Sequence, residues 1–303
     1  MTVLHNPIAI APMMDWTVVH FRQFVRCLSK HVLLYTEMLT CNAVIHGDRE
    51  RLLIFPAEQH PIAIQLGGSD PQACALAAII AESCGYDEIN LNIGCPSERV
   101  KSGGFGACLM LEPDLVAQCI AAMKNVVSIP VTVKTRIGVD KQDHYNFLKN
   151  FVRTVVEAGC DKLIVHARKA WLKGLSPKEN RTIPPLNYET VAQVKKDFPT
   201  LPVVLNGGIR TLESVREHLK VFDGVMLGRA AYENPYLLAE VDQLFYHDND
   251  EGIVHRESVL KRFQPYLEAQ LEKGIPRHRI MRHLMGLYHG EPYAKQWRRQ
   301  CSA

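Results

Sequence analysis

One cysteine stands where the chain could hold a thiol ready for chemistry. The segment Asn90-Leu91-Asn92-Ile93-Gly94-Cys95-Pro96 places it just past an apolar run, between a glycine and a proline. A thiol there is predicted to lie at the end of a strand on a short, rigid turn. It could be a nucleophile, a metal ligand or simply a buried thiol. The nine cysteines are odd in number and include no C-x-x-C pair, so we expect neither a disulfide framework nor a metal site.

Polar side chains also follow the other apolar runs of the chain. They are Asp15, Glu37, Gln65, Asn90, Asn92, Lys134, Arg136, His166, Arg168, Asn206 and Arg229. Any one of them could be a satisfied structural group. Because every run carries at least one, we expect the set to form a functional site at one end of the fold.

Two of these positions predict a phosphate site. Asn206-Gly207-Gly208 and Gly228-Arg229 end the last two apolar runs. Glycines let main-chain N–H groups approach an anion, and an arginine adds a fixed positive charge. Two tight turns without a ligand are the alternative.

Lys134 and Gln65 suit a flavin. A lysine beside the pyrimidine edge of a flavin stabilises the charge of the reduced ring. A glutamine both donates to and accepts from the flavin imide. A Schiff-base role for Lys134, as in aldolase-type barrels, stays open.

The elements that would position these residues alternate between strand and helix. Eight strands are predicted at Ile8–Met13, Leu33–Met38, Ile62–Gly67, Glu88–Gly94, Val131–Gly138, Lys162–Arg168, Val203–Gly208 and Gly224–Arg229. Helices are predicted at Gln72–Cys84, Asp114–Asn125, Phe147–Ala158, Tyr188–Asp197 and Leu212–Val221. Eight alternating units predict an α/β fold, a closed (β/α)8 TIM barrel over residues 1–237. An open doubly wound sheet is less consistent with that count and with the lack of an early Gly-x-Gly-x-x-Gly.

After the last strand the pattern is only helical. Helices are predicted at Leu237–His247, Glu257–Lys273, His278–His289 and Tyr293–Arg299, which indicates a small all-helical domain over residues 238–303. From Arg277 onward Glu291 is the single acid among six lysines and arginines. This composition fits either a solvated helix face or a surface that contacts nucleic-acid phosphates. No apolar run is long enough to span a membrane and no signal-peptide pattern opens the chain, so a cytoplasmic location is expected.

Several motifs together resemble the tRNA-dihydrouridine synthase family, in the order and over the length of the whole chain. They are Ala11–Thr17, Tyr35–Met38, Gln65–Gly68, Asn90–Pro96, Val133–Arg136, Val165–Arg168, Leu205–Ile209 and Met226–Arg229. Asn-x-Gly-Cys-Pro with the following glycine-rich loop is the most specific. The chain departs from the family pattern at Val18-Val19, where the family usually has Asp-Arg.

The resemblance implies an FMN enzyme that reduces uridines of tRNA with NADPH, at positions 20 and 20a of the D-loop, with Cys95 as the proton donor. It implies FMN contacts at Pro12, Met13, Met14, Gln65, Lys134, His166, Asn206, Gly207, Gly208, Gly228 and Arg229. It implies tRNA contacts at Asn92, Lys178, Arg181, Lys295 and Arg298. No stable protein partner is evident.

The chemistry of that reaction is consistent with these residues. Hydride from reduced FMN adds at C6 of the uracil, and a proton must then reach C5 from the other side of the ring. A thiol of ordinary acidity stays protonated near neutral pH and can supply it. The uridine must leave the tRNA stack to reach the site, and the loop Ser97–Ala107 is expected to close over it.

Three other functions remain open from the sequence. They are an FMN barrel acting on a small molecule, a non-catalytic tRNA-binding barrel, and a lyase working through Lys134.

Overall fold

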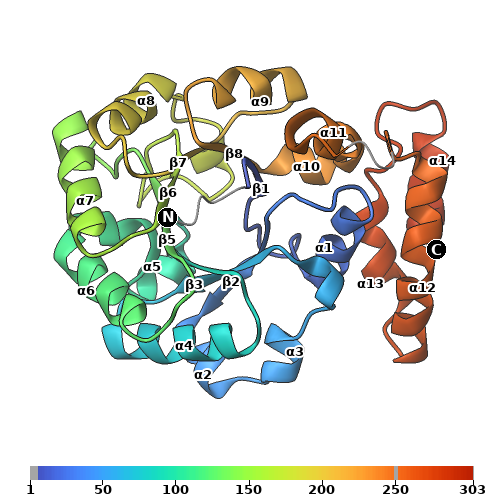
Figure 1. Ribbon diagram of the computed structural model, residues 1–303, viewed down its shortest axis with the longest axis horizontal. Coiled ribbons are helices and arrows are strands. Elements are labelled where there is room, and N and C mark those ends of the chain that lie inside the picture. Colours follow the sequence, from blue (N-terminus) through green and yellow to red (C-terminus); the bar gives the residue numbers. More distant parts are fainter. Residues whose placement is uncertain (1–5, 249–251, 303) are drawn as a thin grey trace.

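Eight parallel strands form one sheet in the computed structural model, which describes residues 6–248 and 252–302. Their order is β1-β8-β7-β6-β5-β4-β3-β2. The strands are β1 Ile8–Ile10, β2 Leu34–Thr40, β3 Ile62–Gly67, β4 Glu88–Ile93, β5 Val131–Arg136, β6 Lys162–His166, β7 Val203–Asn206 and β8 Gly224–Leu227. The Ile10 N–H donates to the Leu33 carbonyl at 2.9 Å and the Leu33 N–H to the Ile8 carbonyl at 3.0 Å, which joins the two ends of the sheet. The predicted (β/α)8 barrel is confirmed (Figure 1).

Helices connect successive strands and lie outside the barrel (Figure 1). Before β8 they are α1 Val19–Arg26, α2 Cys41–His46, α3 Arg49–Leu53, α4 Pro71–Ser83, α5 Glu98–Ser102, α6 Pro113–Lys124, α7 Tyr145–Glu157, α8 Tyr188–Asp197 and α9 Leu212–Leu219. Short 3-10 turns are η1 Ala57–Gln59, η2 Gly106–Leu111 and η3 Glu179–Arg181. The start of α4 follows from Asp70, whose carboxylate accepts from the Ala73 N–H at 2.7 Å, and its end from Gly85 at φ 87°.

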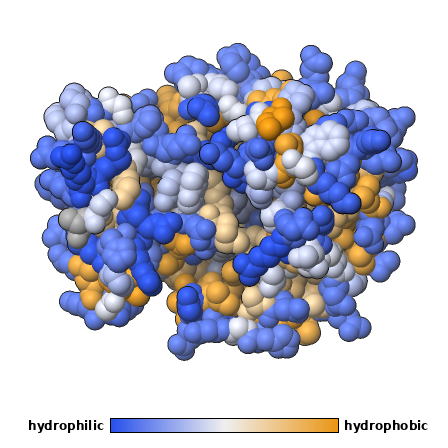
Figure 2. All heavy atoms as spheres, turned by 180° about the vertical axis from the view of Figure 1, so that it is seen from behind, coloured by the Kyte–Doolittle hydropathy of each residue, from blue (hydrophilic) through white to orange (hydrophobic). Residues whose placement is uncertain are grey.

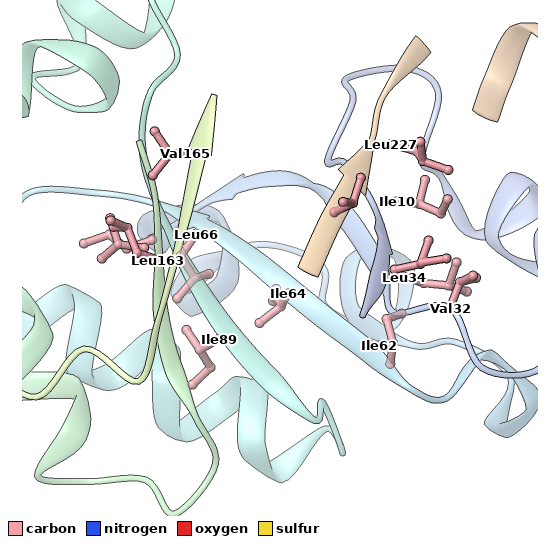
Figure 3. Packing of buried hydrophobic residues seen from close by; sticks show 14 of the residues in the cluster. Ile10, Val32, Leu34, Ile62, Ile64, Leu66, Ile89, Leu163, Val165 and Leu227 are labelled. Carbon is pink, nitrogen blue, oxygen red and sulfur yellow. The ribbon is translucent and has the colours of Figure 1, made fainter. Parts of the chain in front are cut away.

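Side chains alternate between the inside of the barrel and the helix layer. On β4, Ile89, Leu91 and Ile93 pack into the apolar layer between strands and helices. Figure 3 shows part of that layer, which includes Ile10, Ile64 and Leu163. The other residues of β4 face inward because neighbouring residues of a strand point to opposite faces. The predicted strands start within one residue of the observed ones. Most observed strands end earlier than predicted, so Arg168 and Gly207 lie past the strand ends, whereas Asn92, Lys134 and Asn206 remain inside the strands.

The chain continues past β8 as helices only. They are α10 Arg229–Glu233, α11 Val241–Tyr246, α12 Arg256–Glu272, α13 Arg277–Met281 and α14 Ala294–Ser302, with 3-10 turns η4 Pro235–Glu240 and η5 Arg282–Leu284. Helix α12 and the turn η5 pack against α1, and their buried side chains join the same apolar cluster as the barrel. In Figure 2 a notch separates the C-terminal helices, at the left, from the barrel. The boundary at residue 237 stays a prediction.

Two of the predicted C-terminal helices are wrong in detail. The predicted helix His278–His289 ends at Met281 and continues as the 3-10 turn η5. Past η5 the chain continues as turns, and a Cβ atom at Gly286 would lie 2.6 Å from Pro235 Cδ. The predicted helix Leu237–His247 divides into η4 and α11. Residues 249–251, between the predicted helices Leu237–His247 and Glu257–Lys273, lie outside the described residues.

Over residues 6–248 and 252–302, no helix combines the length and the apolar character needed to cross a lipid bilayer.

Candidate active site

Cys95 lies directly after β4, half-buried, on a turn held by a side-chain amide. Asn92 Oδ1 accepts from the main-chain N–H groups of Gly94 at 3.1 Å and Cys95 at 2.9 Å. The Cys95 carbonyl accepts from the Ala107 N–H at 2.9 Å, so the glycine-rich stretch folds back on the cysteine. Its thiol donates to Ser97 Oγ at 3.4 Å. The turn therefore fixes the thiol at the mouth of the barrel.

Asn92 joins Cys95 to Gln65 on the neighbouring strand. The Asn92 Nδ2 donates to Gln65 Oε1 at 2.8 Å, and both side chains are buried. The structure thus brings these two predicted site residues together beside the Cys95 turn. Their shared strand end explains it, because β3 pairs in parallel with β4.

Lys134 lies next to Asn92 in the register of β4 and β5, and it meets Asn206 from β7. Lys134 Nζ donates to Asn206 Oδ1 at 3.0 Å, and Asn206 Nδ2 donates to the Met226 carbonyl at 2.8 Å. Burial, and then the charge of Arg136, lower the pKa of Lys134 to about 7. Among the residues that the structure describes, no carboxylate forms an ion pair with this lysine. Lys134 is therefore a cation without a counter-charge.

His166 lies against the glycine pair that ends β7. A Cβ atom at Gly207 would lie 2.6 Å from His166 Cδ2, and Gly207 has a φ of 114°. Gly208 also has a positive φ, of 76°. Burial, followed by the charges of Arg136 and Lys134, lowers the pKa of His166 well below its ordinary value. The imidazole is therefore neutral at physiological pH and can both donate and accept.

The predicted phosphate region combines free space with one buried donor that has no acceptor among the described residues. Gly228 precedes α10, and a Cβ atom there would meet nothing within 4 Å. Arg229 begins α10 and donates to the Arg181 carbonyl at 3.5 Å. The buried Nε of Arg168 has no hydrogen-bond partner among the described residues. These features fit the anionic cofactor that the motifs imply, because a phosphate would give each donor an acceptor.

Arg136 ties together the two long loops over the mouth. Its Nε donates to the Gly94 carbonyl at 2.8 Å, and its Nη1 donates to the carbonyls of Lys169 and Asn180 at 3.0 Å each. The first loop carries Cys95 and the second carries Arg181. Sequence reasoning placed Arg136 at a strand end but did not predict this role, since main-chain acceptors leave no trace in residue types.

The loop after β1 completes the rim of the mouth. Met13 N–H donates to Thr17 Oγ1 at 3.0 Å, and Met14 exposes 56% of its surface. Val18 occupies the N-cap of α1 and provides no side-chain cap, which is the local consequence of the departure from the family's Asp-Arg. Pro12 and Met13 remain half-buried at the predicted cofactor position.

The basic residues predicted to bind tRNA fall into two groups. Lys178 and Arg181 are exposed around η3 on the loop between β6 and α8. Lys295 and Arg298 are exposed on α14, in the C-terminal helices. Among the described residues no hydrogen bond or ion pair joins the second group to the first, so the two would meet only through a shared ligand.

A possible metal-ligand trio lies apart from the barrel mouth. Ligand atoms of His31, Asp242 and Asp248 lie within 4.8 Å of one another. Asp242 already accepts from the Ser29 hydroxyl and the Lys30 N–H, and Asp248 bonds to His31. These contacts account for the trio as a clamp between α1 and α11.

The fold and the mouth together define a class. The protein is a (β/α)8 barrel whose strand ends bring together a thiol, a glycine pair and a lysine that has no ion-pair partner among the described residues. A sequence model described as dihydrouridine synthase matches residues 9–303. The chain belongs to the dihydrouridine synthase family.

Curated relatives match over nearly the whole chain. A tRNA-dihydrouridine(20/20a) synthase of Synechocystis is 58% identical, covering 98% of this chain and 89% of its own. Proteins of the same name from Shewanella oneidensis and Escherichia coli are 54% and 55% identical, covering 99% and 97% of this chain and 89% and 88% of their own.

Proposed function

We propose that this chain is an FMN- and NADPH-dependent tRNA-dihydrouridine synthase that reduces uridines 20 and 20a of the D-loop. The observation that carries the proposal is the convergence of Cys95, Lys134 and the glycine pair on one mouth of the barrel. The printed names of the relatives, at 54–58% identity, support the substrate and the two positions. A cytoplasmic location is part of the proposal.

Residues of β1, β3, β5 and the last two strands would hold FMN. Gln65 and Lys134 would contact the ring, and Gly207, Gly228 and Arg229 the phosphate. When bound and reduced by NADPH, FMN supplies the hydride that adds at C6 of the uracil. Lys134, whose charge has no counter-ion, would gain one from an anionic ligand, so its pKa would rise on binding.

Cys95 would supply the proton to C5. The turn fixed by Asn92 and the contact with Ser97 hold the thiol at the rim of the barrel mouth. A uracil base bound above the flavin would therefore lie between the flavin and the thiol. The thiol needs only to be protonated and within reach, which distinguishes an acid from a nucleophile. The second hydrogen of Asn92 Nδ2, the one that does not bond to Gln65, would donate to the same base.

The tRNA would be held by the exposed basic residues of both groups. Lys178 and Arg181 would contact phosphates next to the target, and Lys295 and Arg298 would contact phosphates farther away. The C-terminal helices would thus act as the tRNA-binding domain. Since the base must leave its stack, these contacts would offset the cost of unstacking.

A half-reaction experiment tests the proposal. Cys95→Ala should leave NADPH reduction of the bound flavin within about twofold of wild type, since hydride transfer to the flavin does not use the thiol. It should slow flavin reoxidation by tRNA by a factor on the order of 10² or more, the usual contribution of a general acid. A protein that purifies without a flavin, or a variant with both half-reactions unchanged, would contradict the proposal.

One observation favours a second function. A lysine whose pKa is about 7 is also what a Schiff-base enzyme needs, because the free amine is then available at neutral pH. Borohydride trapping of a carbonyl substrate on Lys134 would support the lyase and argue against the flavin enzyme.

A further inference from the structure

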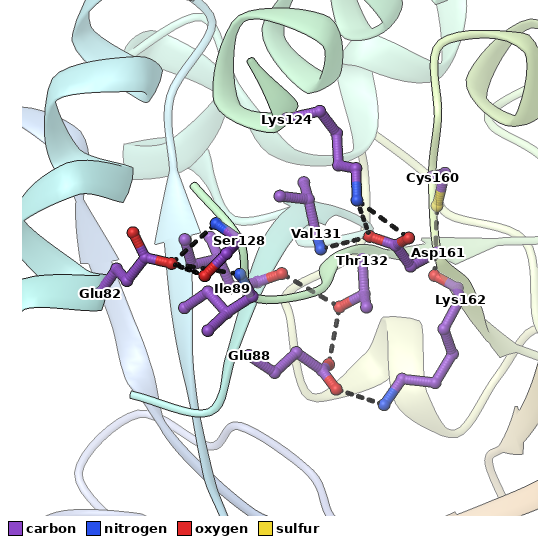
Figure 4. Close-up of polar contacts among 11 residues, drawn as sticks. Glu82, Glu88, Ile89, Lys124, Ser128, Val131, Thr132, Cys160, Asp161 and Lys162 are labelled. Carbon is purple, nitrogen blue, oxygen red and sulfur yellow. Dashed lines mark hydrogen bonds and ion pairs between the residues drawn. The ribbon is translucent and has the colours of Figure 1, made fainter. Parts of the chain in front are cut away.

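A hydrogen-bond chain begins at a buried ion pair inside the barrel. Glu88 pairs with Lys162 and accepts from the Tyr35 hydroxyl. The Thr132 hydroxyl donates to Glu88 Oε1 at 2.7 Å, and Asn90 Nδ2 donates to Thr132 Oγ1 at 2.9 Å. All five side chains are buried, and Figure 4 shows Glu88 between Thr132 and Lys162. The Glu88–Lys162 ion pair thus lies at one end of a polar strip on β4 and β5, the end farther from the barrel mouth.

The chain continues upward to the cysteine. Gln65 Nε2 donates to Asn90 Oδ1 at 2.8 Å, and Asn92 Nδ2 donates to Gln65 Oε1 at 2.8 Å. Asn92 Oδ1 then accepts from the N–H groups of Gly94 and Cys95. An unbroken series of hydrogen bonds therefore joins the buried ion pair to the turn that carries the thiol.

Burying such a polar strip inside a barrel costs folding free energy. Barrel interiors are usually filled by branched aliphatic side chains, and much of the rest of this interior is apolar, with Ala63, Ile164, Val204 and Met226 among its residues. A buried ion pair contributes little net stability, because desolvation offsets the attraction. The polar strip is therefore better explained by what it positions than by stability.

Every link of the chain has a fixed direction. A carboxylate facing the ammonium of Lys162 only accepts, so the single hydroxyl hydrogen of Thr132 points to Glu88 at 2.7 Å rather than to the Ile89 carbonyl at 3.2 Å. Thr132 must then accept from the amide nitrogen of Asn90, which leaves the Asn90 oxygen to accept from Gln65.

The upper end imposes the same direction on the amides. The two main-chain N–H groups of Gly94 and Cys95 require an oxygen of Asn92, which turns its nitrogen toward Gln65. Because both ends of the chain require the same donor and acceptor directions, rotating any one side-chain amide by half a turn would break its hydrogen bonds on both sides.

We propose that Glu88 and Thr132 are positioning residues, which fix the amide orientations of Gln65 and Asn92 and hold the Cys95 turn through this chain. Neither touches a ligand in the proposed reaction; both act through Asn90. The orientation leaves Asn92 one free amide hydrogen toward the mouth and no free carbonyl direction, so a substrate group that it meets must be an acceptor. A uracil carbonyl is such a group. The meaning for catalysis rests on the proposed function, whereas the hold on the Cys95 turn does not.

Two matched substitutions separate positioning from stability. Thr132→Val and Tyr35→Phe each remove one buried hydrogen bond to the same oxygen of Glu88, but only the first cuts the chain to Cys95. In the holoenzyme we expect Thr132→Val to speed iodoacetamide alkylation of Cys95, followed by peptide mass spectrometry, about tenfold, the equivalent of one lost hydrogen bond. Tyr35→Phe should leave that rate within about twofold of wild type, with a similar change in Tm. Thr132→Ser, which restores the hydroxyl, should restore the wild-type rate.

A kinetic split links the chain to the proposed reaction. Thr132→Val should slow flavin reoxidation by tRNA about tenfold and NADPH reduction much less, and Thr132→Ser should recover both. If Thr132→Val does not fold, Asn90→Leu cuts the chain one link higher and takes its place. Equal alkylation rates in the two matched variants would overturn the proposal. Faster alkylation without any tRNA-dependent flavin oxidation in the wild type would support the positioning role and refute the proposed function instead.

Discussion

Lys134 is a charge that the fold holds at a cost, so replacing it with methionine should stabilise the ligand-free protein. Its pKa is about 7 against an ordinary value of 10.5, because it is buried beside Arg136. The gap of about 3.5 pH units, at ~1.4 kcal/mol each, corresponds to ~5 kcal/mol of folding free energy when Lys134 is charged. Water at the open mouth reduces this figure, and we expect Lys134→Met to gain on the order of 2–4 kcal/mol at pH 6.

The sign of the pH dependence follows from the same pKa. Below pH 7 both the folded and the unfolded chain bind the proton, so the folded state carries the full cost. Between pH 7 and about 10 only the unfolded chain binds it, and the stability of the wild type rises with pH. The advantage of Lys134→Met should therefore be largest below pH 7 and shrink by up to ~1.4 kcal/mol per pH unit above it.

Urea unfolding at pH 6, 7, 8 and 9, on protein freed of bound ligand, measures this difference. Lys162→Met is the control, since that lysine also lies inside the barrel but is paired with Glu88. Removing it should destabilise the protein by about 3–5 kcal/mol, because Glu88 would remain as an uncompensated charge. Wild-type and Lys134→Met curves that stay parallel across this pH range would refute the reasoning.

Three further outcomes are expected. Lys295→Ala with Arg298→Ala should weaken tRNA binding and lower the salt slope of log Kd by up to about two, with flavin content unchanged; an unaltered slope in filter binding would remove α14 from the interface. Gly207→Ala should lower stability by about 1–3 kcal/mol and loosen the cofactor, because φ is 114° and the new Cβ would meet His166 at 2.6 Å. Thermal unfolding measures the loss of stability in Gly207→Ala. In the same experiment Gly174→Ala, where φ is 82° and a Cβ atom would meet nothing within 4 Å, gives the part of that loss that comes from backbone strain alone.

The barrel and the identity of the mouth residues could be predicted from the sequence, because both depend on local patterns. The alternation of apolar strands with helices fixes the fold, and the carboxyl ends of parallel strands must meet at one face. Gln65, Asn92 and Lys134 were therefore found from position alone. The partners of their hydrogen bonds could not be predicted, since the sequence does not indicate which way a side-chain amide is oriented.

The buried ion pair was missed although a signal for it exists. Glu88, Asn90 and Asn92 recur with period two in a strand whose other residues are apolar, which places a carboxylate inside the barrel. Its partner Lys162 begins β6, two strands away, and only the closed sheet brings the two together. The predicted helix His278–His289 is wrong beyond Met281, where the chain continues as η5, because the apolar pattern of the sequence does not distinguish the two.

Arg136 makes the two long loops a single mechanical unit. One guanidinium bonds the carbonyl before Cys95 and two carbonyls on the loop of Arg181, so neither loop can lift without losing bonds to the other. Under the proposed function, movement of the Cys95 thiol toward a base and contact of Arg181 with a tRNA phosphate would be coupled events. An RNA that offers a backbone but no base to fill the mouth would then leave both incomplete, so selectivity would depend on the joint position of the two loops as well as on affinity.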